Sequence, residues 1–370
     1  MPRLTEQEQQ EIIRFIEADK PLPDKYRFLL FGDKREVELV WNGKSNDICN
    51  IVLPFQVIEQ VDEPRSEKET KLIEQTSMFD TRGRQLQGWT NKLILSSLKN
   101  GPLRDEIEKQ GGIKLIYIDP PFDVGADFSM DIEIGNDTFT KKPNILEEIA
   151  YRDTWGKGTD SFISMIYERL VLMRDLLTDD GGIFVHCDWR VSPLLRMVLG
   201  EIFGQNNFQN EIYWYYYNKL HGATKRVFPR ATDTILYYLK NRDAGYTFNH
   251  LTEPREKPVK KLKYSFINGK IVNDKDENGK TITYLSTERQ IDNVWRIRCL
   301  QPADKTEWLG YPTQKPQDLI ERIILAASEP NDIVADFFCG SGSSLAAAES
   351  LGRKWIGSDL GKFAIHTTRK

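Results

Sequence analysis

The chain has 370 residues, a formal net charge of −4, 39% hydrophobic residues and 11% aromatic residues. These values exclude a disordered chain and predict one large domain or two ordinary ones. The sequence starts without the apolar core of a secretory signal, contains no uncharged apolar run long enough to span a bilayer, and has no CxxC pair among its four cysteines. We therefore expect a cytoplasmic protein with no membrane partner, zinc site or disulfide framework.

The first 75 residues are expected to form an N-terminal extension separate from the rest of the chain. Within it, residues 6–19 carry isoleucine and phenylalanine at helical spacing, which predicts an amphipathic helix. The mostly charged stretch 61–74 is typical of a linker or an exposed helix. Short apolar runs between polar turns predict strands at 28–31, 36–41 and 48–55.

From about Trp89 onward, predicted strands alternate with predicted helices. The strands are short apolar or aromatic runs, and the helices repeat apolar residues every three or four positions. The expected strands cover residues 115–118, 183–186, 212–217, 234–239, 333–336 and 354–356. The expected helices cover residues 161–177, 193–203, 316–327 and 343–350. This alternation predicts an α/β fold with a doubly wound, mostly parallel sheet.

The sequence Asp119-Pro120-Pro121-Phe122 directly follows one of these strands. Open α/β sheets bind their ligands at the carboxyl ends of the strands, so this is an expected site. Two prolines fix two φ angles and remove two N–H donors, which leaves a stiff corner whose polar groups are acceptors. The alternative is a rigid strand-ending turn in which Asp119 caps a helix.

Such a corner suits the activation of an exocyclic amine on adenine or cytosine. The amine is a poor nucleophile because its lone pair is delocalised into the ring. The Asp119 carboxylate and the Pro120 carbonyl can accept its two N–H bonds and leave the lone pair free to attack. Phe122 offers a face for stacking the base, which contributes roughly 1–3 kcal/mol. The four residues Asp119, Pro120, Pro121 and Phe122 are therefore the candidate catalytic residues.

A basic segment lies in the middle of the chain. Residues 218–263 carry 11 Lys/Arg and 4 Asp/Glu, a local charge of +7, so the remainder carries −11. This distribution is compatible with a phosphate-binding surface, and a plain solvated loop is the alternative. The aromatic run 213–217 is more typical of a strand core than of a stacking platform. The candidate contacts to DNA phosphates or bases are Lys219, Lys225, Arg226 and Arg230.

A glycine-containing turn, Asp336 to Ser344, joins a predicted strand to a predicted helix. Gly340 and Gly342 would let the backbone approach a ligand closely. Asp359 ends the next strand, 17 residues after Gly342, where an acid can accept hydrogen bonds from ribose hydroxyls. A dinucleotide-binding turn needs a third glycine at the position of Leu345, so it is disfavoured. An ordinary tight turn between strand and helix is the other alternative.

Together the two motifs resemble those of the amino-methyltransferase family of DNA-modifying enzymes. Asp119–Phe122 matches the family's Asp-Pro-Pro-Tyr/Phe tetrapeptide, and Phe338–Gly342 matches its Phe-x-Gly-x-Gly turn. The catalytic motif comes first, with the basic segment between the two, as in the β-type circular arrangement. The surrounding sequence is most similar to the adenine-specific methylating subunits of type III restriction-modification systems.

The resemblance implies a circularly permuted, Rossmann-like methyltransferase fold that uses S-adenosylmethionine. It implies a catalytic half over 76–217, a basic target-recognition insertion over 218–292 and a cofactor-binding half over 293–370. The sequence Tyr311–Pro316 resembles the opening of the family's cofactor-side helix. The residues that the resemblance implies for cofactor binding are Thr313, Lys315, Asp336, Phe338, Cys339, Gly340, Ser341, Gly342 and Asp359.

The implied activity is methyl transfer to the exocyclic amine of adenine in double-stranded DNA. Adenine is preferred over the N4 amine of cytosine because the tetrapeptide begins with Asp, which is a family tendency. Carbon-5 methylation of cytosine needs a Pro-Cys nucleophile, and the chain contains no Pro-Cys. A restriction subunit and a second copy of the chain are the further partners to consider. His186 and His221 are interpreted as structural residues.

The sequence departs from the family pattern at one place. Family members carry an acidic turn ahead of the helix that leads into the catalytic strand, whereas residues 91–98 contain no acid. Its absence motivates a second hypothesis, a catalytically weak or silent DNA-binding subunit. A third hypothesis is methylation of RNA or of a protein amide, because similar Pro-Pro-aromatic sites also perform those reactions.

Overall fold

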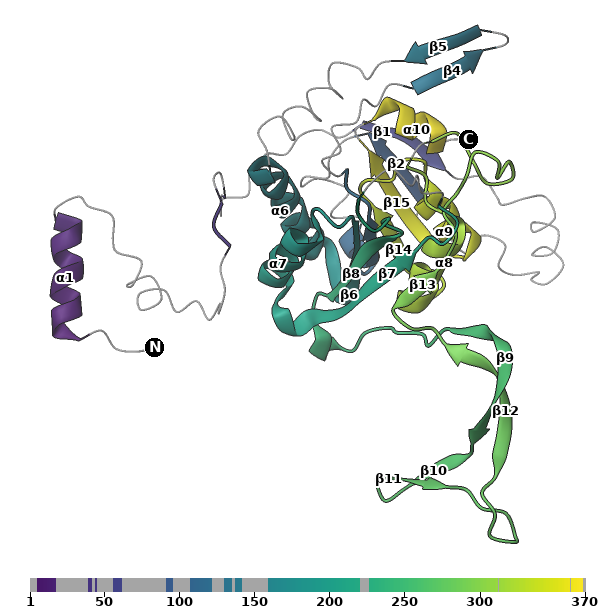
Figure 1. Ribbon diagram of the computed structural model, residues 1–370. Coiled ribbons are helices and arrows are strands. Elements are labelled where there is room, and N and C mark those ends of the chain that lie inside the picture. Colours follow the sequence, from purple (N-terminus) through teal and green to yellow (C-terminus); the bar gives the residue numbers. More distant parts are fainter. Residues whose placement is uncertain are drawn as a thin grey trace. The chain divides into compact units, whose positions relative to one another are not determined.

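The structure is a computed structural model and forms two units, Met1–Val40 and Trp41–Lys370 (Figure 1). It describes residues 5–17, 39–41, 44, 56–61, 91–95, 107–121, 130–134, 137–141, 159–219, 226–311, 313–359 and 361–368. In the first unit, α1 spans Glu6–Glu17 and confirms the predicted helix. Thr5 and Glu8 cap it reciprocally: the Glu8 amide donates to Thr5 Oγ1 (3.3 Å), and the Thr5 amide donates to Glu8 Oε2 (2.7 Å).

The boundary between the units lies at Val40, well before the expected boundary at residue 75. The reason is that Trp41 and Lys44 are tied to helices of the second unit. The Trp41 indole donates to Ser164 Oγ (2.8 Å), and Lys44 pairs with Glu201 (2.6 Å). The strands predicted at 28–31 and 48–55, and most of 36–41, lie outside the described residues.

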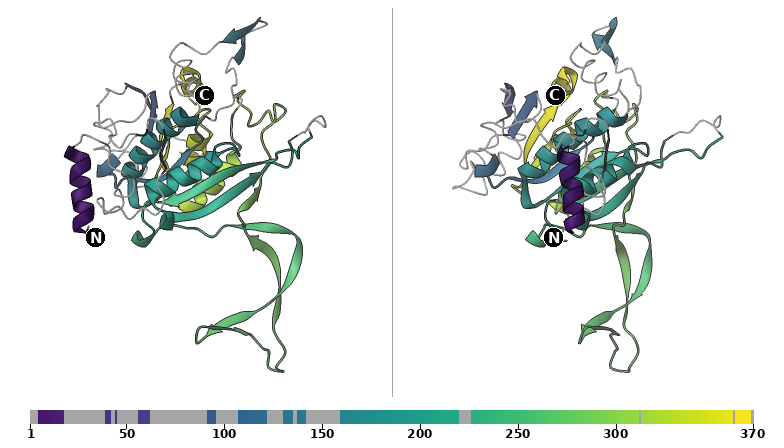
Figure 2. Two further views of the ribbon diagram at one scale, coloured as in Figure 1. Left: turned by 60° about the vertical axis from the view of Figure 1, so that its left-hand side comes forward. Right: turned by 90° about the vertical axis from the view of Figure 1, so that its left-hand side faces the viewer.

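A single sheet of nine strands forms the centre of the second unit, in the order β1-β2-β15-β14-β3-β6-β8-β7-β13 (Figures 1 and 2). Five of its eight neighbouring pairs are parallel, so the predicted mostly parallel sheet is confirmed. The strands are β1 Gln56–Val61, β2 Asn91–Leu95, β3 Ile113–Ile118, β6 Leu177–Cys187, β7 Phe208–Tyr215, β8 Thr232–Leu239, β13 Val294–Arg296, β14 Ile333–Asp336 and β15 Lys354–Asp359.

Helices cover both faces of this sheet, which confirms the doubly wound architecture. Consecutive strand residues point to opposite faces. Tyr237 stacks on Phe184 at 4.0 Å within the core that includes α8 and α9, whereas Tyr238 meets Phe203 of α7 at 6.0 Å on the other face. The helices are α6 Thr159–Leu176, α7 Ser192–Phe203, α8 Gln317–Ala327, α9 Ser343–Ser350 and α10 Lys362–Thr368.

Burial explains why the sequences of the central strands are almost entirely apolar. Every residue of β14 is buried, and so is every residue of β3 except Lys114. Strands covered on both faces need apolar side chains at successive positions. In the described part of the chain, no helix combines the length and the apolar character needed to cross a bilayer.

The range 218–292 is not a single inserted unit, contrary to the prediction. Its residues Thr232–Leu239 form β8, a strand of the main sheet, because their apolar side chains are buried on both faces. Past β8 the chain forms a two-stranded ribbon that leads away from the sheet (Figures 1 and 2). The ribbon comprises β9 Thr252–Leu262 paired with β12 Thr283–Gln290, and continues into the hairpin β10 Tyr264–Ile267 and β11 Lys270–Asn273.

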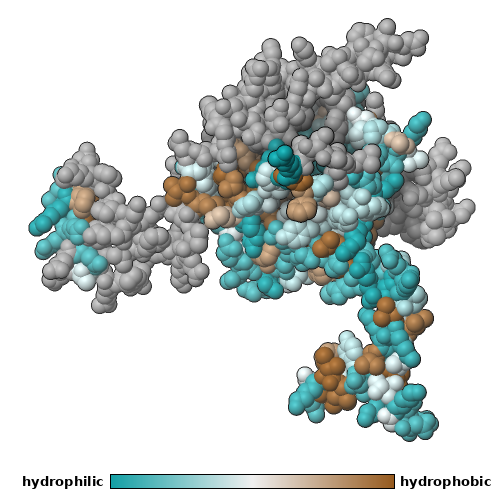
Figure 3. Space-filling model, viewed as in Figure 1, coloured by the Kyte–Doolittle hydropathy of each residue, from teal (hydrophilic) through white to brown (hydrophobic). Residues whose placement is uncertain are grey.

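The ribbon is anchored at its base and exposed along its length. The Asn249 amide donates to Ala326 O (2.8 Å), and its side chain donates to Leu325 O (2.9 Å), both at the end of α8. Figure 3 shows apolar groups on the otherwise hydrophilic ribbon, in agreement with the exposure of Phe266 (71%) and Ile271 (64%). A second hairpin, β4 Met130–Ile134 and β5 Asp137–Lys141, lies between β3 and α6 in the chain.

Leu345, which stands where a dinucleotide-binding turn would have glycine, is accommodated by a glycine on the facing strand. Leu345 of α9 is 3% exposed. A Cβ added to Gly357 of β15 would lie only 2.3 Å from Leu345 Cδ1 and 3.1 Å from Cδ2. The close approach of helix and strand therefore depends on Gly357.

We expect Gly357→Ala to lower the free energy of unfolding by about 1–3 kcal/mol, because an extra methyl group overpacks the contact with Leu345. Urea denaturation measures the change. The matched background is Leu345→Ala, which removes the clashing atoms, so that Gly357→Ala should cost much less there. Equal costs in the two backgrounds would contradict this account of the packing.

Candidate active site

The carboxyl ends of the parallel strands bring the two sequence motifs to one edge of the sheet. β3 pairs with β14 in parallel, with Ile116 opposite Ala335. Asp119 follows β3, and Asp336 ends β14, so both acids lie at this edge. The charge of Asp119 acts on the pKa of Asp336, as expected for neighbouring groups. The fold therefore places the proline corner and the glycine turn at the same edge of the sheet.

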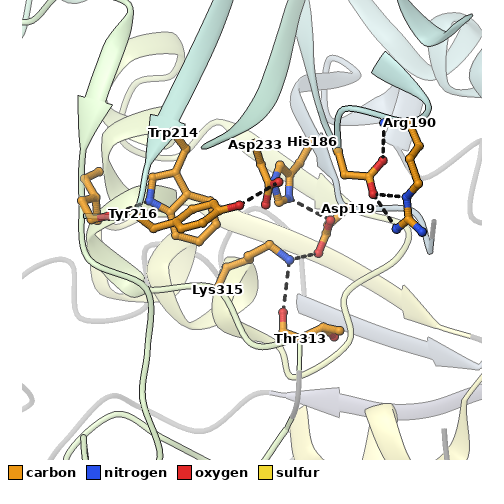
Figure 4. Close-up of polar contacts among 10 residues, drawn as sticks. Asp119, His186, Arg190, Trp214, Tyr216, Asp233, Thr313 and Lys315 are labelled. Atoms are coloured by element: carbon orange, nitrogen blue, oxygen red, sulfur yellow. Dashed lines mark hydrogen bonds and ion pairs between the residues drawn. The ribbon is translucent and has the colours of Figure 1, made fainter. Parts of the chain in front are cut away.

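The Asp119 carboxylate is held between two basic side chains (Figure 4). His186 Nδ1 lies 2.8 Å from Asp119 Oδ1. The Lys315 ammonium group donates a hydrogen bond to Asp119 Oδ2 and another, of 3.2 Å, to the carbonyl of Thr313. The Asp119 side chain is only 17% exposed, so these contacts replace most of its hydration.

This environment keeps Asp119 ionised. Burial raises the pKa of the carboxyl group, but the positive charges and hydrogen bonds of Lys315 and His186 outweigh burial and lower the pKa to about 2. An ionised carboxylate only accepts hydrogen bonds, and each oxygen has two acceptor positions. Asp119 is thus a fixed acceptor at neutral pH.

His186 bridges Asp119 and a second acid, Asp233. Its Nε2 lies 3.5 Å from Asp233 Oδ2, and the Tyr216 hydroxyl donates to Asp233 Oδ1 (3.4 Å) (Figure 4). Burial lowers the pKa of His186, but the charge of Asp119 and the hydrogen bonds that the imidazole donates to both acids outweigh that effect, so the pKa is raised. The indole ring of Trp214 meets the imidazole edge-on at 5.8 Å.

Interpreting His186 only as a structural residue was therefore incomplete. The imidazole is buried, with 1% exposure, yet it contacts the candidate catalytic acid directly. Ile118 of β3 pairs with Val185 of β6, so the next residues along the two strands, Asp119 and His186, lie beside each other. A polar residue near the end of an otherwise apolar strand beside the catalytic one was the available signal. Asp233 carried no such signal, because it reaches the site from the distant strand β8.

The glycine turn is organised by its own acids. Asp336 accepts hydrogen bonds from the Phe338 amide (3.0 Å) and from the Ser344 hydroxyl. Asp359 accepts from the Gly340 amide (2.9 Å) and from the Gly361 amide (2.7 Å). These bonds fix the turn against β15 and the start of α10.

Both glycines of the turn have backbone conformations that favour glycine. Gly340 has φ of 51° and Gly342 has φ of 82°, both in the left-handed region that other residues rarely adopt. A Cβ on Gly340 would lie 3.4 Å from the ring of Tyr311, so the backbone and the ring are close together. Burial raises the pKa of Asp336 to about 7, although the hydrogen bonds from Ser344 and Phe338 lower it.

The remaining predicted cofactor residues divide between the interior and the surface. Cys339 and Ser341 are buried, with 5% and 6% exposure: Cys339 belongs to the hydrophobic core, and Ser341 Oγ lies 3.1 Å from Ser343 Oγ. Phe338 is half-buried, and Thr313 is exposed. Lys315 faces Asp119, which links the segment before α8 to the proline corner. Of the candidate catalytic residues, Pro120 is buried, Pro121 is half-buried and Phe122 lies outside the described residues.

The predicted DNA-contact residues lie on the loop between β7 and β8. Tyr215 pairs with Thr232, and Cys187 with Thr234, so this loop leaves the sheet at the edge that carries Asp119. The Arg230 guanidinium lies over the Trp189 ring at 3.9 Å, and the Lys219 ammonium lies over the Tyr216 ring at 4.9 Å. Arg226 is exposed, and Lys225 lies outside the described residues.

The site fits S-adenosylmethionine on the chemistry of its donors and acceptors. The positive-φ glycines give the turn a backbone course that a side chain would hinder, and half-buried Gly340 has the Tyr311 ring beside it. Asp359 is a hydrogen-bond acceptor at this turn, taking the Gly340 and Gly361 amides, and an acid at this position is the type of group that accepts from ribose hydroxyls. In the described part of the chain, no cluster of His, Cys, Asp and Glu has the geometry to hold a metal ion.

Comparison with known proteins agrees with this arrangement. Residues 113–370 match the family model N6_N4_Mtase, described as DNA methylase. The chain is 30% identical over 305 residues to the type II methyltransferase M.EcaI of Enterobacter cloacae, a match that covers 70% of this chain and 64% of that protein. It is 28% identical over 273 residues to the type II methyltransferase M1.MboII of Moraxella bovis, covering 69% of this chain and 87% of that protein.

A further relative is the DNA adenine methyltransferase YhdJ of Escherichia coli strain K12, 26% identical over 254 residues, with 67% of this chain and 72% of that protein covered. The match to the family model begins at the first residue of β3 and continues to the end of the chain. It therefore includes the proline corner, His186, Lys315 and the glycine turn. The chain belongs to the DNA methylase family.

Proposed function

We propose that the protein transfers a methyl group from S-adenosylmethionine to the exocyclic amine of adenine in double-stranded DNA. The observation that carries the proposal is the ionised Asp119 carboxylate beside the glycine turn, fixed by Lys315 and His186. Two acidic turns meet at this edge: one supplies acceptors for an amine, and the other, with half-buried Gly340 and the Asp359 carboxylate, is assigned to the nucleoside.

The residues of the chain act by orientation and electrostatics. When bound, S-adenosylmethionine supplies an electrophilic methyl group. The Asp119 carboxylate and the Pro120 carbonyl accept the two N–H bonds of the amine, which withdraws its lone pair from the ring. Because its pKa is about 2, Asp119 is a weak base, so it serves as a hydrogen-bond acceptor and does not retain the proton. Phe122 offers a face for stacking the base.

Adenine as the target base is the finer part of the proposal. The Asp at the start of the tetrapeptide and the relative YhdJ, named as an adenine methyltransferase, support it. The N4 amine of cytosine presents two N–H bonds to the same acceptors and is the alternative. The relatives M.EcaI and M1.MboII are named as type II enzymes, whereas the likeness to type III subunits, and with it a restriction subunit or a second copy as partner, stays a prediction.

We assign DNA contact to the loop between β7 and β8 and to the ribbon that follows β8. Residues 218–232 contain no acidic residue and include Lys219, Lys225, Arg226 and Arg230. On the ribbon, Lys257, Lys260, Lys261 and Lys263 follow one another without an intervening acid. Both regions offer cations to a phosphate backbone, and the loop does so beside Asp119.

The test of the function is methyl transfer by the full chain. Tritiated S-adenosylmethionine is supplied with duplex DNA, RNA or a glutamine peptide, and the modified bases are located by sequencing DNA from a bacterial host that expresses the protein. We expect label in DNA alone, on adenine. If a calorimetric titration detects no binding of S-adenosylmethionine, the hypothesis of a catalytically silent subunit is favoured. If the label is found on the N4 amine of cytosine, the target base is cytosine and not adenine.

We expect Asp119→Asn to reduce methyl transfer by about two orders of magnitude or more, because one preorganised polar group aimed at the reacting amine is lost. Calorimetry should show that S-adenosylmethionine still binds. Asp180→Asn is the matched control, since Asp180 is also paired with a lysine, Lys114, but stands at the opposite ends of β3 and β6. Full activity of the Asp119 variant would refute the assignment.

We expect Lys315→Gln to move the acid limb of the pH profile to higher pH. Burial raises the pKa of Asp119, and Lys315 is the first of the groups that lower it to about 2. Without that charge, Asp119 becomes protonated at a higher pH, so kcat/KM falls earlier as the solution is acidified. Lys315→Arg keeps the charge and should keep the limb near its original position. A uniform loss of activity at all pH values would contradict this role for Lys315.

We expect replacement of Lys219, Lys225, Arg226 and Arg230 by Gln to weaken DNA binding and flatten its salt dependence. The slope of log K against log salt should change by up to about 4, close to 1 for each phosphate that the protein no longer neutralises. Fluorescence anisotropy at several salt concentrations measures it. The control variant replaces Lys257, Lys260, Lys261 and Lys263 of the ribbon by Gln, which removes the same number of positive charges as the loop variant. If only this ribbon variant changes the salt slope, the cations that bind phosphate lie on the ribbon and not on the loop.

A further inference from the structure

The loop between β7 and β8 carries the most exposed of the large hydrophobic side chains in the described part of the chain. Phe228 is 96% exposed. A single exposed apolar side chain needs no explanation by itself. Phe228, however, follows Arg226 and precedes Arg230, both exposed, in a stretch without acidic residues from 218 to 232. An aromatic ring flanked by cations is complementary to a nucleic acid, which offers phosphates beside stacked bases.

The loop also stands next to the candidate catalytic acid. Phe228 is five residues before Asp233, a distance of at most about 17 Å along an extended chain. Asp233 Oδ2 lies 3.5 Å from His186 Nε2, and His186 Nδ1 lies 2.8 Å from Asp119 (Figure 4). The contact of Arg230 with Trp189 at 3.9 Å holds this end of the loop against the segment that follows β6.

Methylation at Asp119 requires the target base to leave the double helix. An exocyclic amine inside a duplex cannot reach a carboxylate that is only 17% exposed. The departure leaves a gap in the stack, and proteins that distort DNA commonly insert an apolar side chain into such gaps. Phe228 has the chemistry, the exposure and the placement for this task.

We propose that Phe228 enters the duplex and fills the space vacated by the target base while that base is held at Asp119. The inference rests on the proposed function and adds to it the residue that stabilises the opened duplex. Phe266 of the ribbon is similarly exposed, at 71%. The base of the ribbon, however, is hydrogen-bonded to the last turn of α8, whereas Lys315, which contacts Asp119, precedes the first turn of α8. The ribbon therefore starts from the end of α8 that is away from Asp119. Phe266 therefore serves as the matched control.

The experiment compares two oligonucleotide duplexes that carry the sequence methylated by the wild-type chain. One is fully paired, and in the other the target base stands opposite an abasic site, which makes it easy to extrude. We expect Phe228→Ala to lower kcat/KM on the paired duplex by about tenfold or more, as for the loss of one aromatic stack on a base, and to recover near wild-type activity on the abasic duplex. Phe228→Trp should retain activity on both, and Phe266→Ala should show no recovery specific to the abasic duplex.

Two results would overturn the inference while the function stands. Either Phe228→Ala methylates the paired duplex as fast as the wild type, or it is impaired equally on both duplexes, which would mean that Phe228 contributes to binding or folding instead. Unchanged S-adenosylmethionine binding in the variant separates these two causes. Absence of methylation of any DNA by the wild-type chain would overturn the proposed function, and this inference with it.

Discussion

The central physical constraint in this protein is the burial of an ionised carboxylate at the edge of a parallel sheet. Removing a carboxylate from water is costly unless charged and hydrogen-bonding partners replace the lost hydration. Asp119 obtains these partners from three separate parts of the fold: Lys315 from the segment before α8, His186 from β6 and, through His186, Asp233 from β8. This arrangement of side chains therefore forms only when these parts of the fold are assembled, so the candidate site depends on long-range folding.

Two neighbouring acids show how partners decide the effect of burial. Burial raises the pKa of both Asp119 and Asp336, yet the outcome is about 2 for the first and about 7 for the second. Asp119 faces the Lys315 ammonium group and the His186 imidazole, whereas Asp336 accepts hydrogen bonds from a hydroxyl and an amide and is close to two other acids. The first arrangement gives a permanent hydrogen-bond acceptor, which the proposed function assigns to the substrate amine. The second stabilises the glycine turn, because Asp336 accepts hydrogen bonds from the Phe338 amide and the Ser344 hydroxyl inside the protein.

The DNA-contact regions that we propose are divided by the same sheet. β8 separates the basic loop 218–231 from the ribbon that begins at Thr252, although charge counting along the sequence merges them. The loop shares an edge with Asp119, and the ribbon starts from the far end of α8. This separation favours different tasks, with the loop acting on the target base and the ribbon on more distant parts of the duplex. Membership of the DNA methylase family is consistent with both.

The sequence alone was sufficient to predict the α/β sheet, the strand that precedes Asp119, the strand that ends at Asp336 and the two motifs. The reason is that apolar periodicity, prolines and glycines act on the local backbone. It also led to Lys315, although as a cofactor contact. Only the tertiary structure revealed the partners of Asp119. His186 looked like a buried strand residue and Asp233 like a strand end, and neither is near Asp119 along the chain. Strand order and register decide which side chains share an edge, and these depend on long-range packing that no local pattern encodes.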